Sequence, residues 1–301
     1  MKYYLTLVAK EENNNLSQEA LDKVTKLLNE RHIEISTTNE LAEKICSEFL
    51  ISGVTNTKFL TAEVRNLLNE YEIDVFLIEE DLRKIKKLLI ADMDSTIIQN
   101  ECIDEIARYA GKYEEVSRIT EAAMSGKIPF EDSLTGRVRS LKGVTTSCLE
   151  KIFSENITLS KGAITLGKTL KKFNCNSVVA SGGFTFFTSK VKNLISFDQD
   201  YANTLEFVEN QLTGELIPPI FGSQSKLETT LKLITELNIS SDEVIAVGDG
   251  ANDIPMLTSI NLGVAYKAKW AVREKLLNQI NFTDLTSLLY IQGIAKKDFA
   301  S

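Results

Sequence analysis

Two acidic residues separated by one position, Asp92 and Asp94, are the first sign of chemistry in this sequence. They follow the apolar run 88–91, which predicts a buried strand, so both carboxylates lie on the loop just past its end. Two carboxylates this close require a bound cation or a shared proton, and Mg²⁺ suits them because it prefers oxygen ligands. The alternative is a helix N-cap, in which Asp94, Ser95 or Thr96 accepts hydrogen bonds from the following helix.

A second acidic group follows another apolar run. Residues 244–247 predict a strand, and Gly-Asp-Gly-Ala-Asn-Asp comes directly after it at 248–253. The glycines suit a tight turn or the close approach of a ligand to the backbone. If the two strands are neighbours in a parallel sheet, Asp92, Asp94 and Asp249 meet around one metal ion.

A small hydroxyl and a lysine complete a set that suits a phosphate group. Ser181, followed by Gly182 and Gly183, comes after a third apolar run and offers one hydroxyl and unobstructed backbone N–H groups, which bind anions. Lys226 opens a predicted helix over residues 226–237 and can supply a positive charge. Ser-Gly-Gly is a weak signal alone, and a lysine is most often a solvated surface residue. The indication comes from the whole set, in this chain order: an acid pair, a small hydroxyl, a lysine and a second acidic group.

The composition excludes several other kinds of site. The 301 residues contain one histidine, His32, so any Ser-His-Asp, Cys-His or histidine-rich zinc site depends on it alone. The four cysteines form no CxxC pair and are expected to be reduced thiols of a cytoplasmic protein. The formal charge of −8 argues against a nucleic-acid or membrane-surface partner, and no apolar run reaches the roughly 20 residues of a membrane span. Carboxylates, lysines and hydroxyls must therefore carry any catalysis.

The N-terminal part has the predicted order strand–helix–strand–strand–helix–strand. Its expected strands are residues 3–9, 33–38, 44–51 and 73–78, although 41–48 could instead be helical. Helices are expected after the N-cap Ser17 and over residues 61–71. This order is typical of a ferredoxin-like α+β domain. A packing role, a homodimer contact and the binding of a regulatory ligand all stay open for it.

The remainder of the chain alternates short apolar strands with helices. This alternation predicts an α/β fold with a parallel sheet covered on both faces, which binds ligands at the carboxyl ends of its strands. Residues 97–111 are expected to be helical, because their apolar residues lie on one helical face.

In this order the motifs resemble the DxD, Ser/Thr, Lys and GDxxxD motifs of the haloacid dehalogenase superfamily of phosphohydrolases. The stretches DMDSTIIQNECIDEIA, SGGFTFFT and GDGANDIPML resemble the phosphoserine phosphatase family more closely, over about residues 88–265. The N-terminal part resembles, more loosely, the ACT-like module that precedes this enzyme in many bacteria. The resemblance implies an ACT-like module at 1–84 and a Rossmann-like core at 85–301, with a small helical cap inserted at about 101–159.

The resemblance also implies roles for the acidic residues. Asp92 is expected to attack phosphorus and form an aspartyl-phosphate, while Asp94 protonates the leaving serine oxygen and then activates water. Mg²⁺ is expected between Asp92, the backbone carbonyl of Asp94, and Asp249, with Asp253 supporting the metal shell.

The implied substrate is O-phospho-L-serine, with a phosphate, an ammonium and a carboxylate to be recognised. Ser181, the Gly182 N–H and Lys226 are expected to hold the phosphoryl oxygens, and Asn252 to contact the substrate. All four lie in the motifs that carry the resemblance or in the helix between them.

The cap is expected to supply specificity. Arg137 can grip the substrate carboxylate bidentately and Glu101 can pair with its ammonium group. Met124 and Phe130 match the apolar wall of the family and are expected to exclude water when the cap closes. From the residues alone, an ordinary surface ion pair between Glu101 and Arg137 is the simpler alternative.

The sequence departs from the family pattern Ala-Tyr-His-Ala-Lys-Pro at two positions, where Lys267 and Trp270 replace His and Pro. Two rival functions remain open. One is a phosphotransferase that passes the phosphoryl group to another hydroxyl, such as that of homoserine. The other is a non-catalytic amino-acid sensor, against which the complete set of phosphoryl-transfer residues argues.

Overall fold

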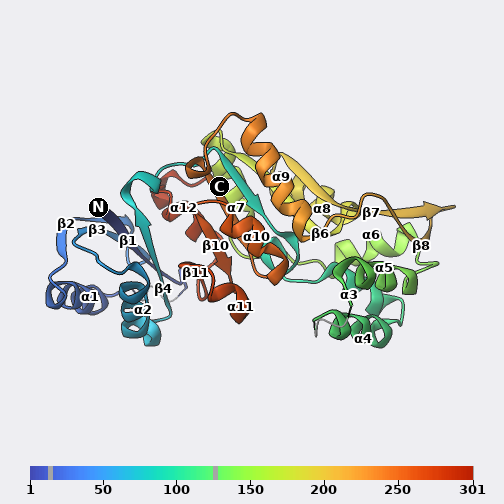
Figure 1. The fold of residues 1–301 in the computed structure, drawn as a ribbon, viewed down its shortest axis with the longest axis horizontal. Coiled ribbons are helices and arrows are strands. Elements are labelled where there is room, and N and C mark those ends of the chain that lie inside the picture. The colour runs from blue at the N-terminus through green and yellow to red at the C-terminus, as the bar shows by residue number, and fades with distance from the viewer. Residues whose placement is uncertain (13–15, 125–127, 301) are drawn as a thin grey trace.

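The computed structural model describes residues 1–12, 16–124 and 128–300, apart from the side chain of Met124. A four-stranded sheet, a seven-stranded sheet and a group of helices follow one another along one long axis (Figure 1). Within the described ranges, no helix has both the length and the apolar character that a bilayer crossing requires.

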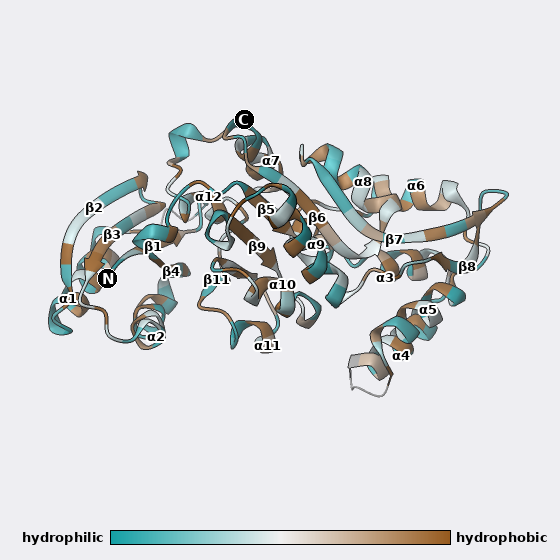
Figure 2. Cartoon of the chain, turned by 45° about the horizontal axis from the view of Figure 1, so that its top comes forward, coloured by the Kyte–Doolittle hydropathy of each residue, from teal (hydrophilic) through white to brown (hydrophobic). Residues whose placement is uncertain are grey.

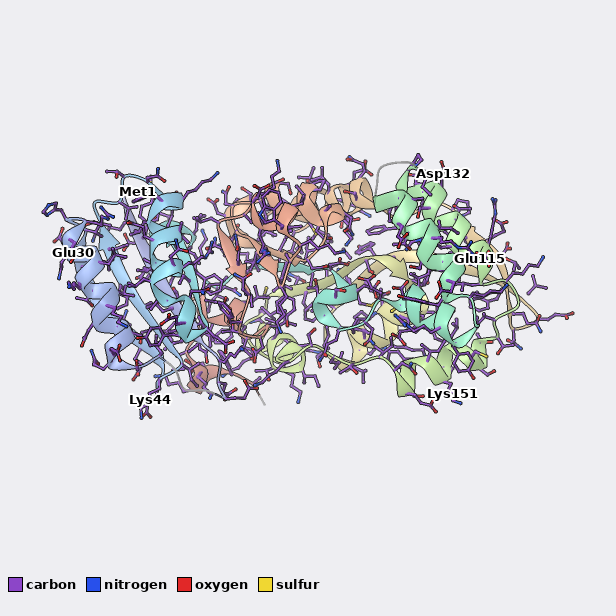
Figure 3. The ribbon with its side chains drawn as sticks, turned by 90° about the horizontal axis from the view of Figure 1, so that it is seen from below. Met1, Glu30, Lys44, Glu115, Asp132 and Lys151 are labelled. Atoms are coloured by element: carbon purple, nitrogen blue, oxygen red, sulfur yellow. The ribbon has the colours of Figure 1, made fainter. Side chains whose placement is uncertain are left out.

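The labelled side chains of Figure 3 mark the two ends of this elongated molecule. The end with the N-terminal sheet carries Met1, Glu30 and Lys44. The opposite end, formed by helices, carries Glu115, Asp132 and Lys151. The seven-stranded sheet lies between them and joins the two.

The N-terminal sheet has the strand order β2-β3-β1-β4, with antiparallel pairing throughout. Its elements are β1 Lys2–Ala9, α1 Gln18–Glu30, β2 Glu34–Ala42, β3 Cys46–Ser52, α2 Thr57–Leu68 and β4 Ile73–Glu79. The predicted order of strands and helices is confirmed, and Ser17 caps α1 by accepting the Ala20 N–H. Residues 41–48, which could have been helical, contribute to β2 and β3.

Side chains alternate between the two faces of this sheet, and both faces of β4 are buried. On β4, Val75 and Leu77 pack with α1 and α2, whereas Phe76 and Ile78 pack into the apolar core of the larger sheet. The outer strand β2 is mostly exposed and largely teal to white in Figure 2. A homodimer through this module stays a prediction.

The larger sheet has the order β11-β10-β9-β5-β6-β7-β8. Its strands are β5 Leu88–Ala91, β6 Asn176–Phe184, β7 Gln199–Val208, β8 Gln211–Ile217, β9 Val244–Gly248, β10 Gly263–Tyr266 and β11 Asn278–Ile280. The surrounding helices are α7 Ala163–Lys172, α8 Thr185–Leu194, α9 Ser223–Glu236, α10 Ile254–Thr258, α11 Trp270–Arg273 and α12 Ser287–Tyr290. All pairings are parallel except that of β7 with β8, so the predicted α/β core is confirmed.

The central strands are short and wholly apolar, as strands covered on both faces must be. Every residue of β5 and β9 is buried, and β9 is brown in Figure 2. Helices on both sides therefore hold these strands rigidly, and the loops that leave their carboxyl ends are fixed in place.

In the described part of the chain, a group of four helices is inserted between β5 and α7. They are α3 Cys102–Tyr109, α4 Tyr113–Met124, α5 Phe130–Ser140 and α6 Thr146–Glu155. The hairpin of β7 and β8, which the sequence analysis missed, reaches out to them: the Gly143 N–H donates to the Leu212 carbonyl and the Leu212 N–H to the Val144 carbonyl, both at 2.8 Å. The insert is thus supported by the core along one side.

The predicted helix over 97–111 was wrong in its first turn. The chain entering the insert is extended, because the Gln99 N–H donates to the Thr158 carbonyl at 2.9 Å and the Ser160 N–H to the Ile97 carbonyl at 2.8 Å. These bonds join the entry and the exit of the insert, and α3 begins only at Cys102. Helical periodicity could not reveal a partner some 60 residues away.

A buried carboxylate adds polar contacts to the apolar packing between the N-terminal module and the core. Asp74 on β4 is 2% exposed and accepts backbone N–H groups from Asn281, Phe282 and Thr283, at 2.8 to 3.2 Å, together with the Thr283 hydroxyl at 2.6 Å. These donors belong to the segment that follows β11, so the contact crosses between the two sheets.

We predict that Asp74→Asn destabilises the protein by about 2–3 kcal/mol, because an amide cannot accept all of these buried donors. Urea unfolding of the full chain measures the change. Asp81→Asn, which makes the same change at an exposed position, is the matched control and should be near neutral. Equal effects of the two changes would show that Asp74 has no special part in fastening the module.

Candidate active site

The three strands that carry the acidic and hydroxyl motifs are neighbours. Ala91 of β5 pairs with Val179 of β6 on one side and Val247 of β9 on the other. Because the strands are parallel, their carboxyl ends share one edge of the sheet. The loops at this edge bring the two acidic motifs and the Ser-Gly-Gly turn together around one cavity.

Lys226, in the first turn of α9, is fully buried beneath that edge. Its Nζ lies 2.8 Å from Asp92 Oδ1 and 2.6 Å from Asp253 Oδ1. Asp253 Oδ2 also accepts the Gly250 N–H at 3.0 Å. Burial alone would lower the pKa of Lys226, but Asp253 and Asp92 outweigh it and hold that pKa above its usual value. Lys226 is therefore a fixed positive charge.

The carboxylate of Asp92 is held by one of its two oxygens. Oδ1 accepts the Met93 N–H at 2.7 Å and the Lys226 ammonium at 2.8 Å. Oδ2 has no hydrogen-bond partner among the described residues, so it is available for a new bond. Burial, and next the charge of Asp253, raises the pKa of Asp92 well above its usual range.

Three carboxylates gather where a cation could bind. Asp92, Asp249 and Asp253 each offer an oxygen, and these oxygens lie within 4.8 Å of one another. Burial and the charge of Asp253 raise the pKa of Asp249 to about 6. Among the described residues, these three acids form ion pairs with a single ammonium group, that of Lys226, so the set of oxygen donors keeps a net negative charge. Such a set fits a divalent cation with oxygen preference.

The carboxylate of Asp94 is not part of this group of three. Its Oδ1 accepts the Cys102 N–H at the start of α3 at 3.1 Å, and its Oδ2 lies 3.5 Å from the Ser181 hydroxyl. Burial, followed by the charge of Glu101, raises the pKa of Asp94 to about 7. A carboxyl group with that pKa can both give and take a proton near neutral pH.

The Ser-Gly-Gly turn packs directly against Asp94. The Ser181 hydroxyl accepts the Gly183 N–H at 2.9 Å. A Cβ atom on Gly183 would lie 2.6 Å from Asp94 Oδ2, so glycine lets the backbone approach this carboxylate closely. The turn ends β6, and α8 starts immediately after it at Thr185.

One buried residue that sequence reasoning missed positions two parts of the site. Asn203 on β7 donates to the Gly182 carbonyl and the Phe221 carbonyl, both at 2.9 Å, and accepts the Phe221 N–H at 2.7 Å. It thereby ties the Ser-Gly-Gly turn to the loop that leads into α9 and Lys226. No sequence motif marks it, because its partners come from distant segments.

The cavity above these residues has a volume of about 190 Å³. The predicted site residues in its lining are Asp92, Asp94, Glu101, Phe130, Arg137, Ser181, Gly182, Asp249 and Asn252. Lys226 and Asp253 are fully buried and do not line it. The side chain of Met124, at the end of α4, lies outside the described residues.

Glu101 and Arg137 line the cavity without pairing with each other. Glu101 accepts the Ser95 hydroxyl at 2.7 Å, and Arg137 Nε donates to the Ser133 carbonyl at 3.4 Å. No ion pair joins the two side chains in the described part of the chain. Burial lowers the pKa of Arg137, which Asp104 and Glu101 partly oppose. One cation and one anion therefore face the same cavity separately.

Phe130 and Lys269 also line the cavity. Phe130, at the start of α5, lies near the backbone of Gly182 and Gly222, since added Cβ atoms there would come within 3.4 and 3.2 Å of its ring. The Lys269 N–H donates to the Asp249 carbonyl at 3.2 Å. Lys269 was not predicted as a site residue, although it lies in the motif segment after β10.

Comparisons with known proteins agree with this geometry. Residues 86–261 match the model of the haloacid dehalogenase-like hydrolase family. A phosphoserine phosphatase of Saccharomyces cerevisiae is 34% identical over 97% of this chain and 96% of its own. The crystal structure of a probable phosphoserine phosphatase from Vibrio cholerae has a TM-score of 0.81 at 32% identity, covering 98% of this chain and 88% of that one. A phospho-aspartyl intermediate analogue of phosphoserine phosphatase has a TM-score of 0.63 at 40% identity, covering 69% and 99%.

We predict that Lys226→Met lowers the free energy of unfolding by about 3–5 kcal/mol, because it leaves the buried carboxylates of Asp92 and Asp253 without their counter-charge. Urea unfolding without divalent cations measures this cost. Lys232→Met is the matched control on the same helix, since Lys232 is exposed and pairs only with Glu236 at 3.7 Å. A similar small loss in both variants would contradict the charge-balance argument.

Proposed function

The chain belongs to the phosphoserine phosphatase family of haloacid dehalogenase-like hydrolases, and we propose that it hydrolyses O-phospho-L-serine to L-serine and phosphate with Mg²⁺ as cofactor. The observation that carries this proposal is the pairing of Asp92 with the buried Lys226, directly beneath a cavity that also presents Arg137 and Glu101.

Asp92 is the nucleophile in this proposal. Because Lys226 and the Met93 N–H hold Oδ1, the carboxylate cannot rotate away and its other oxygen is free to react. A carboxylate oxygen attacks phosphorus, a bond from Asp92 to phosphorus forms, and the bond from phosphorus to the serine oxygen breaks. The solved intermediate analogue of a related phosphoserine phosphatase supports this assignment.

Asp94 acts as the general acid and then as the general base. It gives its proton to the serine oxygen as that oxygen leaves, and then takes a proton from the water that attacks the phosphorus of the aspartyl-phosphate. The second attack releases phosphate and restores Asp92. The N–H of Cys102 keeps the Asp94 carboxyl oriented towards the cavity edge during both steps.

Asp92, the backbone carbonyl of Asp94 and Asp249 would hold the cofactor, with Asp253 in support. When bound, Mg²⁺ supplies positive charge that offsets the repulsion between carboxylates and phosphate. Asp253 also forms an ion pair with Lys226. The same side chain would therefore contact Lys226 and support the bound Mg²⁺.

Substrate recognition is divided between core and insert. The Ser181 hydroxyl, the Gly182 N–H and Lys226 stabilise the phosphoryl oxygens, and Asn252 contacts the substrate. Arg137 binds the substrate carboxylate, and Glu101 binds the substrate ammonium group. These two side chains carry opposite charges and face the same cavity. Phe130 forms an apolar wall that limits access of water, a role that the sequence also predicts for Met124.

We divide the chain into an ACT-like module at 1–84 and a catalytic core at 85–301 with a cap at about 101–159. The two sheets support the first boundary, and the hydrogen bonds that join residues 97–99 to 158–160 support the second. We place the enzyme in the cytoplasm, because all four cysteines are unpaired.

We predict that Asp92→Asn abolishes phosphate release from O-phospho-L-serine, because an amide is not a competent nucleophile. Phosphate release is measured with Mg²⁺, with EDTA and after Mg²⁺ is restored. A circular dichroism spectrum verifies that the variant is folded. Undiminished turnover in the variant would contradict the nucleophile assignment, and activity unaffected by EDTA would contradict the cofactor. Added homoserine tests for transfer to an alcohol in place of water.

Arg137→Gln should lower kcat/KM for O-phospho-L-serine by roughly 30- to 150-fold, since a charge-assisted hydrogen bond contributes about 2–3 kcal/mol. It should leave kcat/KM for p-nitrophenyl phosphate, which has no carboxylate, nearly unchanged. Arg139→Gln is the matched control two residues away, because Arg139 is exposed and pairs with Glu215. Equal losses with both substrates would place Arg137 outside carboxylate recognition.

A further inference from the structure

A second cavity, of about 530 Å³, lies where the N-terminal module meets the core. The module contributes α2 and the start of β4, and the core contributes α11 and the segments after β10 and β11, which lie beside them in Figure 1. Its volume falls in the range of small-molecule sites. No residue of the phosphatase site described above lines it.

The cavity carries more positive than negative charge. Three cationic side chains line it, Arg65 from α2, Lys267 after β10 and Arg273 from α11. None of them forms an ion pair with another described residue. The one carboxylate in the lining, Asp74, already accepts the N–H groups of the segment after β11. Three cations concentrated in one hollow of a protein with a net charge of −8 require an explanation.

Arg65 is the least exposed of the three cationic side chains. Its Nη2 donates to the Val75 carbonyl at 3.1 Å and to the Leu277 carbonyl, which joins the module to the core. Its Nε is buried and has no partner among the described residues. Burial lowers the pKa of Arg65 to about 10, against the opposing charge of Asp74. An unpartnered buried donor is costly, so the described residues satisfy this guanidinium incompletely.

Lys267 and Arg273 provide the exposed side of the same hollow. Lys267 has a left-handed backbone, with φ of 43°, and its N–H donates to the Ile280 carbonyl at 2.7 Å. Its side chain adds a cationic group to the lining of this cavity.

We propose that this interface cavity binds a small organic anion that carries carboxylate or phosphate groups. The three cations bind its charged groups, and the apolar side chains of Ile73 and Phe282 in the lining contact its carbon skeleton. Because the ligand touches both the module and the core, its binding fastens one to the other. The proposal does not depend on the reaction catalysed at the other cavity.

The test is isothermal titration calorimetry on the full chain with Mg²⁺ at constant ionic strength. Succinate and inorganic phosphate are the two probes, which distinguish a carboxylate from a phosphate preference. We expect saturable binding of at least one probe, and a loss of at least tenfold in that affinity in Arg273→Gln and in Lys267→Gln. Lys275→Gln is the matched control, because Lys275 is exposed in the same segment but does not line the cavity.

Three results would overturn the proposal. The first is the absence of saturable binding of either probe to the unmodified chain. The second is unchanged affinity in Arg273→Gln, which would place the binding elsewhere, including the phosphatase site. The third is an equal loss in Lys275→Gln, which would mean a diffuse effect of charge. Both substituted cavity residues are exposed, so the variants are expected to fold.

Discussion

The burial of Lys226 between two carboxylates constrains the rest of the structure. A lysine that is 0% exposed is stable only if its charge is matched, and Asp92 and Asp253 supply that match from two different strand ends. β5 and β9 must therefore be neighbours, and α9 must begin directly beneath them. The same arrangement holds Asp92 by one oxygen and leaves an excess of negative charge at the edge of the sheet.

Rigid support for this charge cluster comes from outside the motifs. The apolar strands β5 and β9 are buried throughout, so the loops that follow them cannot drift. Asn203 links the Ser-Gly-Gly turn to the loop before α9, and so connects the phosphate-binding groups of β6 to Lys226. The hairpin that carries Asn203 also supports the helical insert. Positioning of the reacting groups and placement of the cap thus depend on the same two strands.

The sequence reveals those parts of this site that depend on local patterns, and conceals those that depend on distant partners. Apolar runs followed by acids or glycines located all three strand ends. The burial of Lys226 could not be predicted, because its partners lie 27 and 134 positions away and most lysines are solvated. The first turn of the predicted helix over 97–111 failed for the same reason, since pairing with residues 158–160 overrides local preference. The β7–β8 hairpin was missed because its strands are partly exposed and lack apolar runs.

The segment after β10 has a place in both cavities. Lys267 lines the cavity between module and core, and two residues later Lys269 lines the phosphatase site and donates its N–H to the Asp249 carbonyl. The backbone N–H of Lys267 is hydrogen-bonded to the Ile280 carbonyl, and that of Lys269 to the carbonyl of Asp249, a residue of the anionic cluster. The cavity between module and core therefore lies two residues along the chain from a backbone contact with the phosphatase site.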